Sequence, residues 1–347
     1  MAEQKLLSIV IPTYNRAELI CYTLSLFKEQ IVRNSSECEL IVCDNLSTDA
    51  TVDNVETYLQ SNSFFSFVKY AEHVEVGDSI TRSIENALGK FFIVFGDDDL
   101  PAPFMVDTLL FELKKYPDIG MLVFNRMAGT SSHCSIGVSD LRVEGYFRID
   151  EGEKYYTNYK EFVSNYNIQA GFISVDVLRR DLWEKRYKDV YPNNHEGWNY
   201  MLPYFYSVQG FPALYYQHPL CIRRAPARSG NNGHHQWEDR WGLYIFVGKA
   251  RLLMCLEKYG MIDDWKKIYQ DYIGSMPMMY HKLVNMTKAQ SLAPYIEELC
   301  AAQLYPKRVR MLRRLVMNKG IVYRLWTLYY KSVFSLYSKS QRIFKHS

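Results

Sequence analysis

Short apolar runs alternate with helical periodicities over residues 6–124. An apolar run that ends at polar residues or proline is typical of a buried strand, whereas apolar residues three to four positions apart indicate a helix. Only a few polar residues link each strand to the next helix, which predicts βαβ units and a mostly parallel sheet. The predicted strands are 6–12, 38–43, 67–70, 91–95 and 119–124, and the predicted helices are 17–30, 51–59, 78–88 and 104–113.

The pattern after residue 124 is less regular. We expect an edge strand over 143–147, a helix over 200–208 and a last strand over 214–224. From Trp237 onward the spacing is helical, including residues 262–273. The sequence therefore predicts an α/β domain over residues 1–225 and a helical C-terminal region over residues 226–347, which begins with a loop.

Three consecutive carboxylates follow the apolar run Phe91–Phe95 after a single glycine. Asp97, Asp98 and Asp99 repel one another, and each resists burial in its charged form. Ligands of open α/β sheets gather at the carboxyl ends of the strands, and hard divalent cations prefer carboxylate oxygens. A helix cap would explain one or two of these acids, so three favour a metal or ligand site.

Polar residues also follow the other strands, with Asp44 after the second and Asp78 after the third. These acids are expected at the same sheet edge as Asp97–Asp99. Neither a Gly-x-Gly-x-x-Gly nor a Gly-x-x-x-x-Gly-Lys segment occurs, so the Rossmann dinucleotide and P-loop interpretations lose their main support.

The seven cysteines are scattered without Cys-x-x-Cys spacing, which favours a reduced cytosolic protein over a disulfide framework or zinc site. Neither a signal peptide nor an uninterrupted apolar stretch of transmembrane length is evident.

The net charge of +3 conceals an asymmetry. Residues 305–347 hold eleven Lys and Arg and no Asp or Glu, which leaves 30 basic against 38 acidic residues in the first 304. This C-terminal segment mixes its basic residues with Trp, Tyr and Leu, a composition that suits a helix on an anionic membrane surface. A helix packed on the protein with a basic outer face is the alternative.

Three ordered blocks resemble the family 2 glycosyltransferases, which are inverting nucleotide-sugar enzymes of the GT-A fold. The resemblance covers about the first 120 residues, and three blocks in order are far more specific than one. The blocks are Ser8–Arg16 (SIVIPTYNR), Ile41–Asp49 (IVCDNLSTD) and Gly89–Asp99 (GKFFIVFGDDD).

The resemblance implies a donor pocket formed by the loops that follow the strands. The family's first loop lies under the nucleotide, and its Asp after the second strand accepts hydrogen bonds from the base. A residue near the third helix often contacts base or ribose, although the usual Asn-x-Gly is here Glu72–Gly77; Arg82, one turn after Asp78, could also simply pair with it. The implied nucleotide-sugar residues are Pro12, Thr13, Asn15, Arg16, Asp44, Asp78, Arg82 and Asp97. For Asp44–Asp49, a turn and helix cap is the alternative.

The family's Asp-x-Asp holds Mg²⁺ or Mn²⁺ against the two donor phosphates, where the cation neutralises the leaving diphosphate. Reading Asp97-x-Asp99 gives this motif directly. Alignment on Pro103 instead makes Asp98 the principal ligand. Both registers remain open.

The family also supplies a general base that deprotonates the acceptor hydroxyl, from a Glu-Asp pair at the start of a helix. This chain has His195-Glu196 there, so Glu196 is the expected base by position and His195 the alternative. Arg224, Arg228, His234 and His235 are candidates for contacting phosphate or metal at the loop that closes over the donor, unless they are merely solvated. The resemblance further implies that residues 171–174 and 176–178 are the family's strand and helix before the acceptor site. Trp183 and Trp198 are candidates for stacking on the acceptor.

These residues predict a metal-dependent inverting glycosyltransferase that uses a nucleotide-sugar donor and a surface-glycan acceptor, such as a lipid-linked O-antigen repeat. We expect it at the cytoplasmic face of the cell membrane, held by residues 305–347. A nucleotidyltransferase of sugar phosphates is the competing enzyme, but residues 12–16 lack the Gly-rich, Lys-containing loop. A nucleic-acid-binding protein is the non-enzymatic alternative; it leaves the carboxylates unexplained, and we expect no nucleic-acid partner.

Overall fold

The computed structural model describes residues 4–130, 139–143, 153–166, 171–191, 200–225 and 248–274. They belong to two compact units. The first contains every described element from β1 to β10 together with residues 259–262, and the second contains α9 (Lys249–Lys258) and α10 (Trp265–Gly274). The helices α9 and α10 agree with the helical pattern after Trp237, while the boundary at residue 225 stays a prediction.

The N-terminal half of the first unit is the predicted parallel sheet, in the order β3-β2-β1-β4. Every residue of β4 is buried, as its unbroken apolar sequence predicts for a strand covered on both faces. The strands are β1 (Leu7–Thr13), β2 (Cys38–Asp44), β3 (Ser66–Lys69) and β4 (Phe91–Val94).

The sheet continues beyond β4 through β9 (Asp176–Arg179), β6 (Met121–Thr130), β10 (Ala213–Ala225) and the two-residue β5 (Leu100–Pro101). β9 is antiparallel to both β4 and β6, whereas β6 and β10 are parallel. Two further strands pair off this path: β7 (Ser139–Val143) with β6, and β8 (Lys154–Tyr156) with β10. Of the edge strand predicted over 143–147, only Val143 lies among the described residues, at the end of β7.

The prediction for residues 171–178 is wrong in its element types. Ile173–Val175 form a 3₁₀ turn, Asp176–Arg179 form strand β9, and the helix begins only afterwards as α6 (Arg180–Arg186). The reason is tertiary: β9 inserts between β4 and β6, where Val177 and Leu178 are fully buried, and strand pairing with both neighbours overrides a short ambiguous sequence.

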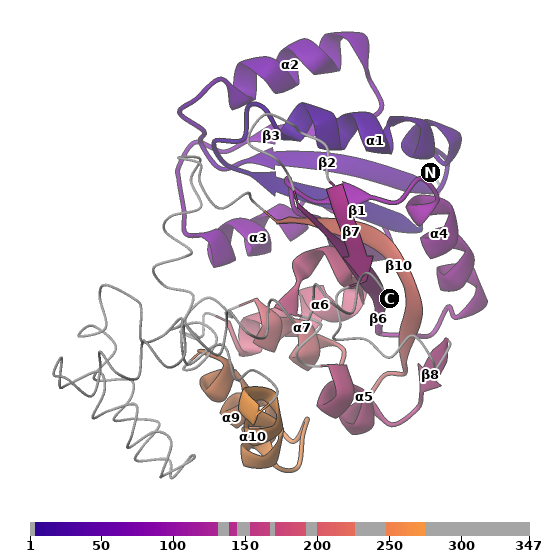
Figure 1. The fold of residues 1–347 in the computed structure, drawn as a ribbon, viewed down its shortest axis with the longest axis vertical. Coiled ribbons are helices and arrows are strands. Elements are labelled where there is room, and N and C mark those ends of the chain that lie inside the picture. Colours follow the sequence, from indigo (N-terminus) through magenta and orange to yellow (C-terminus); the bar gives the residue numbers. More distant parts are fainter. Residues whose placement is uncertain are drawn as a thin grey trace, which may run out of the picture. The chain divides into compact units, whose positions relative to one another are not determined.

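Helices cover both faces of the sheet (Figure 1). On one face, α1 (Ile20–Arg33) lies between α2 (Thr51–Ser61) and α4 (Met105–Lys115), and its Phe27 ring meets Phe95 edge-on at 5.0 Å. The other face carries α3 (Val76–Ile84), α6 and α7 (Met201–Ser207), while α5 (Tyr159–Tyr166) follows β8. This three-layer arrangement covers both faces of a mixed sheet, in which the predicted parallel pairing holds for β3-β2-β1-β4 and β6-β10, while β5, β7, β8 and β9 pair antiparallel.

An aromatic cluster joins the sheet to α6 and α7. Phe92 contacts Trp183 and Tyr204 edge-on at 5.8 and 6.3 Å, and the Trp183 ring is stacked on Tyr187 at 4.9 Å. Trp183 is 1% exposed, so the prediction that it stacks on an acceptor is wrong: its indole is core.

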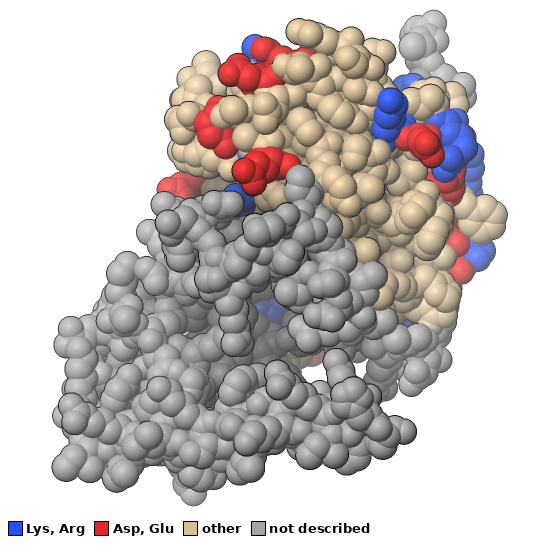
Figure 2. Space-filling model, turned by 45° about the horizontal axis from the view of Figure 1, so that its top comes forward, with Lys and Arg blue, Asp and Glu red and all other residues tan. Residues whose placement is uncertain are grey.

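Within the described ranges, every helix is too short or too polar to cross a lipid bilayer. On the described part of the face in Figure 2, acidic and basic side chains form small groups among uncharged residues.

Gly89, which lies just before β4, is in close contact with the backbone of β1. A Cβ added there would lie 2.8 Å from the backbone N of Ser8 and 2.9 Å from the carbonyl carbon of Leu7, and backbone atoms of a buried strand cannot yield cheaply. We expect Gly89→Ala to lower the free energy of unfolding by about 1–3 kcal/mol in denaturant titration. Leu88→Ala, at a neighbouring side chain that is 62% exposed, should change it by less than about 0.5 kcal/mol. Equal effects of the two substitutions would contradict the close contact.

Candidate active site

The loop after β1 holds the first acid of the Asp97–Asp99 turn. The Thr13 hydroxyl donates to Asp97 Oδ2 at 2.7 Å, and Arg16 Nε donates to Asp97 Oδ1 at 3.4 Å. Pro12 lies inside β1 opposite Cys43 and directly precedes Thr13. The structure therefore brings together three of the residues predicted to bind the nucleotide-sugar, Thr13, Arg16 and Asp97, at the carboxyl ends of β1 and β4.

Two hydroxyl groups that the sequence did not single out fix the rest of this turn. Thr23 Oγ1, on α1, donates to the carbonyl oxygen of Asp97 at 2.9 Å. Ser174 Oγ accepts from the Gly96 backbone N at 2.8 Å and donates to Asp99 Oδ2 at 2.5 Å. Neither residue carries a sequence motif, because each reaches the turn only through the fold.

Gly96 leaves room for two carboxylates to turn back over it. A Cβ at this position would lie 2.7 Å from Asp99 Oδ2 and 3.3 Å from Asp98 Oδ1, so both oxygens occupy the space beside the glycine. Asp98 is only partly buried, and within the described residues its carboxylate receives no hydrogen bond. Asp98 is thus the acid with the most unused acceptor capacity.

The donor set fits a divalent cation. No group of three or more His, Cys, Asp or Glu side chains among the described residues is arranged as a metal site. Mg²⁺ is nevertheless commonly held by one or two carboxylates together with substrate phosphates and water. Asp98 and Asp99, which each place a carboxylate oxygen beside Gly96, supply two such carboxylates.

Burial dominates the electrostatics of the turn. It raises the pKa of Asp97 to about 6, against the attraction of Arg16, and it raises the pKa of Asp99 further than the Ser174 hydrogen bond can offset. The charge of Asp98 pushes both pKa values in the same upward direction. Four arginines act on the three acids in return: Arg16, Arg126, Arg223 and Arg224.

The loop after β2 is built as a turn and is fastened to the loop after β1. Ser47 donates to both oxygens of Asp44, from its N at 2.9 Å and its Oγ at 2.5 Å. Asn15, in the left-handed region at φ 54°, accepts from Thr48 N at 2.8 Å. The turn interpretation of Asp44 is confirmed, and its contact with a base stays a prediction.

The predicted pairing of Arg82 with Asp78 is wrong. The Arg82 guanidinium donates to Asn45 Oδ1 and to the Glu72 carbonyl oxygen, and it lies 3.8 Å above the Tyr70 ring. Asp78 is exposed in the first turn of α3, where the helix macrodipole suits an acid. Arg82 thus belongs to the group at the ends of β2 and β3, whereas Asp78 makes no described contact with it.

An aromatic pair borders these loops. The rings of Tyr14 and His73 lie 4.4 Å apart, and His73 Nδ1 hydrogen-bonds the Asn45 carbonyl oxygen at 3.1 Å. Tyr14 keeps 39% of its surface exposed. The sequence showed that Glu72–Gly77 depart from the family pattern, but not that His73 returns to the first loop.

The predicted bases His195 and Glu196 lie outside the described residues, as do Trp198, Arg228, His234 and His235. A separate group of buried polar side chains comes from β9, β6 and α7. Asp176 is fully buried, and within the described residues neither of its oxygens is hydrogen-bonded, nor are Asn125 Nδ2 and the Tyr204 hydroxyl. Burial raises the pKa of Asp176 well above its usual range, with Arg126 opposing the shift.

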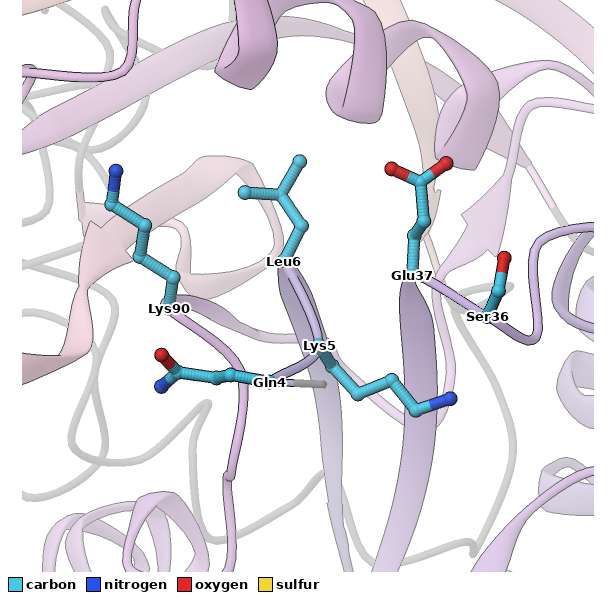
Figure 3. A pocket seen from close by; sticks show the side chains of 6 residues that line it. All are labelled: Gln4, Lys5, Leu6, Ser36, Glu37 and Lys90. Atoms are coloured by element: carbon cyan, nitrogen blue, oxygen red, sulfur yellow. The ribbon is translucent and has the colours of Figure 1, made fainter. Parts of the chain in front are cut away.

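A pocket at the opposite, amino ends of the strands does not share this chemistry. Lys90, Leu6 and Glu37 extend into it on the same side (Figure 3). The Lys90 ammonium already donates to the Pro117 carbonyl oxygen at 3.0 Å, and Glu37 pairs with Lys114 at 2.6 Å. Strand direction therefore separates this pocket from the carboxylate turn.

Asp176→Asn should change how stability depends on pH. Because the folded-state pKa is raised, the folded wild type binds more protons than the unfolded chain above about pH 4, and its stability falls as pH rises. Asn has the same shape and does not titrate. In denaturant titrations between pH 5 and 8, the free energy of unfolding of the variant should rise relative to that of the wild type by up to about 1.4 kcal/mol per pH unit. Parallel pH profiles would contradict the raised pKa.

Comparisons with known proteins agree with this geometry. Residues 8–163 match the model of "Glycosyl transferase family 2". No curated protein sequence matches the chain.

Among solved structures, the unliganded crystal structure of S. aureus TarS 1–349 is similar at a TM-score of 0.58 and 15% identity, over 90% of this chain and 86% of that chain. Its complexes with UDP-GlcNAc and UDP, at the same identity and coverage, give TM-scores of 0.56 and 0.54. At this identity the likeness establishes the fold, which is the predicted GT-A fold. The match over residues 8–163 supports the assignment of this region to glycosyl transferase family 2, whose members are glycosyltransferases.

Proposed function

We propose that the protein is a metal-dependent inverting glycosyltransferase that moves a sugar from a nucleotide-sugar to a hydroxyl of a surface glycan. The observation that carries this proposal is the turn Asp97–Asp99, which is bonded to the β1 loop through Thr13 and Arg16. It joins the polar side chains of the β1 end to a candidate cation site at the carboxyl edge of the sheet, where α/β folds bind ligands.

The donor nucleotide would lie against the loops after β1, β2 and β3. The partly exposed Tyr14 ring offers a stacking surface, and Asp44 retains acceptor capacity for a base because each carboxylate oxygen has more than one lone pair. Arg82, fixed by Asn45 and Tyr70, supplies a positive charge beside them. The complexes of TarS with UDP-GlcNAc and UDP support a nucleotide-sugar as the donor class.

Asp98 and Asp99 would hold Mn²⁺ or Mg²⁺, since each places a carboxylate oxygen beside Gly96. When bound, such a cation neutralises the diphosphate that leaves. Asp97, which already accepts hydrogen bonds from Thr13 and Arg16, would keep the β1 loop in place and face the nucleotide.

Glu196 would take the proton of the acceptor hydroxyl, with His195 as the alternative base. In an inverting transfer the hydroxyl attacks C1 from the face opposite the diphosphate, so base and leaving group lie on opposite sides of the sugar. The acceptor we propose is a lipid-linked glycan such as an O-antigen repeat. Residues 305–347 would hold the enzyme at the cytoplasmic face of the membrane through their eleven basic side chains.

The donor proposal is tested by nucleoside diphosphates in thermal denaturation with and without Mn²⁺. The midpoint should rise by several degrees for the correct nucleoside diphosphate plus metal, because a ligand at 100 times its Kd adds about 2.7 kcal/mol of stability. Asp98→Asn and Asp99→Asn should lower the metal-dependent part and reduce sugar transfer about 100-fold or more. Asp118→Asn, an exposed acid outside the site, is the matched control. A panel in which no nucleoside diphosphate stabilises the wild type would refute the proposal.

The membrane proposal is tested in the full chain by replacing Arg313, Arg314, Arg324 and Lys331 with Gln. Each basic residue near an anionic surface contributes about 1 kcal/mol, so binding to vesicles rich in phosphatidylserine should fall by about two orders of magnitude or more. Wild-type binding should weaken with salt and be absent on neutral phosphatidylcholine vesicles. Unchanged vesicle binding by the variant, or retention of DNA or RNA in place of vesicles, would contradict the membrane role.

A further inference from the structure

Arg224 is a buried cation near the end of β10. It lies one residue before the end of this strand and is 7% exposed. Among the residues that the structure describes, none of its three guanidinium nitrogens, Nε, Nη1 and Nη2, has a hydrogen-bond partner. A guanidinium carries five N–H donors and stays protonated at neutral pH, so the side chain is buried with its charge and all its donors unused.

Strand pairing and electrostatic interactions place this guanidinium beside the carboxylate turn. β10 runs antiparallel to β5, and Ile222 pairs with Leu100, the residue after Asp99. Arg224 follows Ile222 by two residues. Its electrostatic partners are Asp98 first, then Asp99 and Asp97, and its guanidinium carbon lies 5.7 Å from the Tyr22 ring centroid on α1. Arg224 therefore faces the same space as the unbonded Asp98 carboxylate without bonding to it.

The neighbouring cation shows the contrast. Arg16 is also close to the turn, but it forms an ion pair with Asp97 at 3.4 Å. Burial lowers the pKa of Arg224 more than the three acids raise it, so attraction from the acids does not repay the loss of water. A buried charge without hydrogen bonds is costly, and proteins retain such groups chiefly where a ligand completes them.

An anion with several acceptor oxygens would complete the arrangement. The planar guanidinium matches phosphate bidentately. A cation held by Asp98 and Asp99 would repel Arg224 if the two met directly, whereas a diphosphate between them is attracted to both. A carbohydrate hydroxyl carries no charge and would leave the buried charge of Arg224 uncompensated.

We propose that Arg224 binds the donor diphosphate, with its guanidinium placed on the side of the phosphates opposite the cation held by Asp98 and Asp99. This inference rests on the proposed nucleotide-sugar donor and names a binding residue within that site. Because negative charge on the diphosphate grows as the glycosidic bond breaks, a fixed cation there favours departure of the leaving group as well as donor binding.

The test compares Arg224→Gln, which removes the charge, with Arg224→Lys, which keeps the charge but loses the planar fork. Kd is measured by calorimetry for the nucleoside diphosphate that stabilises the wild type, for its nucleoside and for inorganic pyrophosphate, with Mn²⁺ and with EDTA. Arg224→Gln should weaken nucleoside diphosphate and pyrophosphate binding about 10- to 100-fold with either additive. Nucleoside binding should not change, and Arg224→Lys should be intermediate.

Unliganded stability separates this role from a structural one. Arg224→Gln removes an unpaired buried charge, so without ligand the variant should unfold at the same temperature as the wild type or higher. Arg33→Gln, at an exposed arginine paired with Asp107, controls for loss of positive charge and should leave all three affinities unchanged.

If the wild type binds a nucleoside diphosphate and Arg224→Gln binds it equally well, the Arg224 proposal is overturned while the donor proposal stands. The same holds if the variant is destabilised without ligand and nucleoside and diphosphate binding fall together. If the wild type binds no nucleoside diphosphate, the donor proposal fails first and the Arg224 inference fails with it.

Discussion

The local structure of the site depends on burying two carboxylates, Asp97 and Asp99, beside a third that is only partly buried, at the end of a fully buried strand. Burial favours the protonated form of both buried acids, as their raised pKa values show. Hydrogen bonds from the surrounding structure stabilise the charged forms: Thr13 and Arg16 donate to Asp97, and Ser174 donates to Asp99. These donors come from segments far apart in sequence, so the fold and the site are stabilised by the same bonds.

The backbone of the turn is also constrained, by the space beside Gly96 and by hydrogen bonds from α1. The space beside Gly96 is taken by two carboxylate oxygens, which any Cβ would displace. The Thr23 hydroxyl holds the Asp97 carbonyl from α1. Gln30, also on α1, accepts from Val106 N and donates to the Ala102 carbonyl oxygen, so the chain leaving the turn is anchored to the same helix. α1 therefore positions the acids as well as covering the sheet.

The sequence was enough for the parallel half of the sheet and for the acids themselves, because both leave local signals. An apolar run such as Phe91–Phe95 needs no partner to be recognised as a buried strand, and three adjacent acids cannot be explained as a cap. It was not enough for β9, which is a strand only because β4 and β6 pair with it on either side. Ser174, Thr23 and the His73 ring were missed for the same reason: each acts through a contact with a residue at least 59 positions away, for which one chain carries no local pattern.

Arg224 shows most clearly what the sequence alone could not decide. The sequence named it as one of four candidates for contacting phosphate or metal and gave no reason to prefer any of the four. The structure distinguishes it by an imbalance: the residue is buried, and its donors are unused. Asp98 shows the complementary imbalance: in the described part of the chain its carboxylate receives no hydrogen bond, whereas those of Asp97 and Asp99 do. The two unsatisfied groups attract each other yet do not bond, so neither is the other's final partner. A cation would satisfy Asp98 and repel Arg224, and a lone anion would do the reverse. A diphosphate with its metal ion satisfies both at once, which is why the same ligand accounts for an acid and an arginine left open in one site.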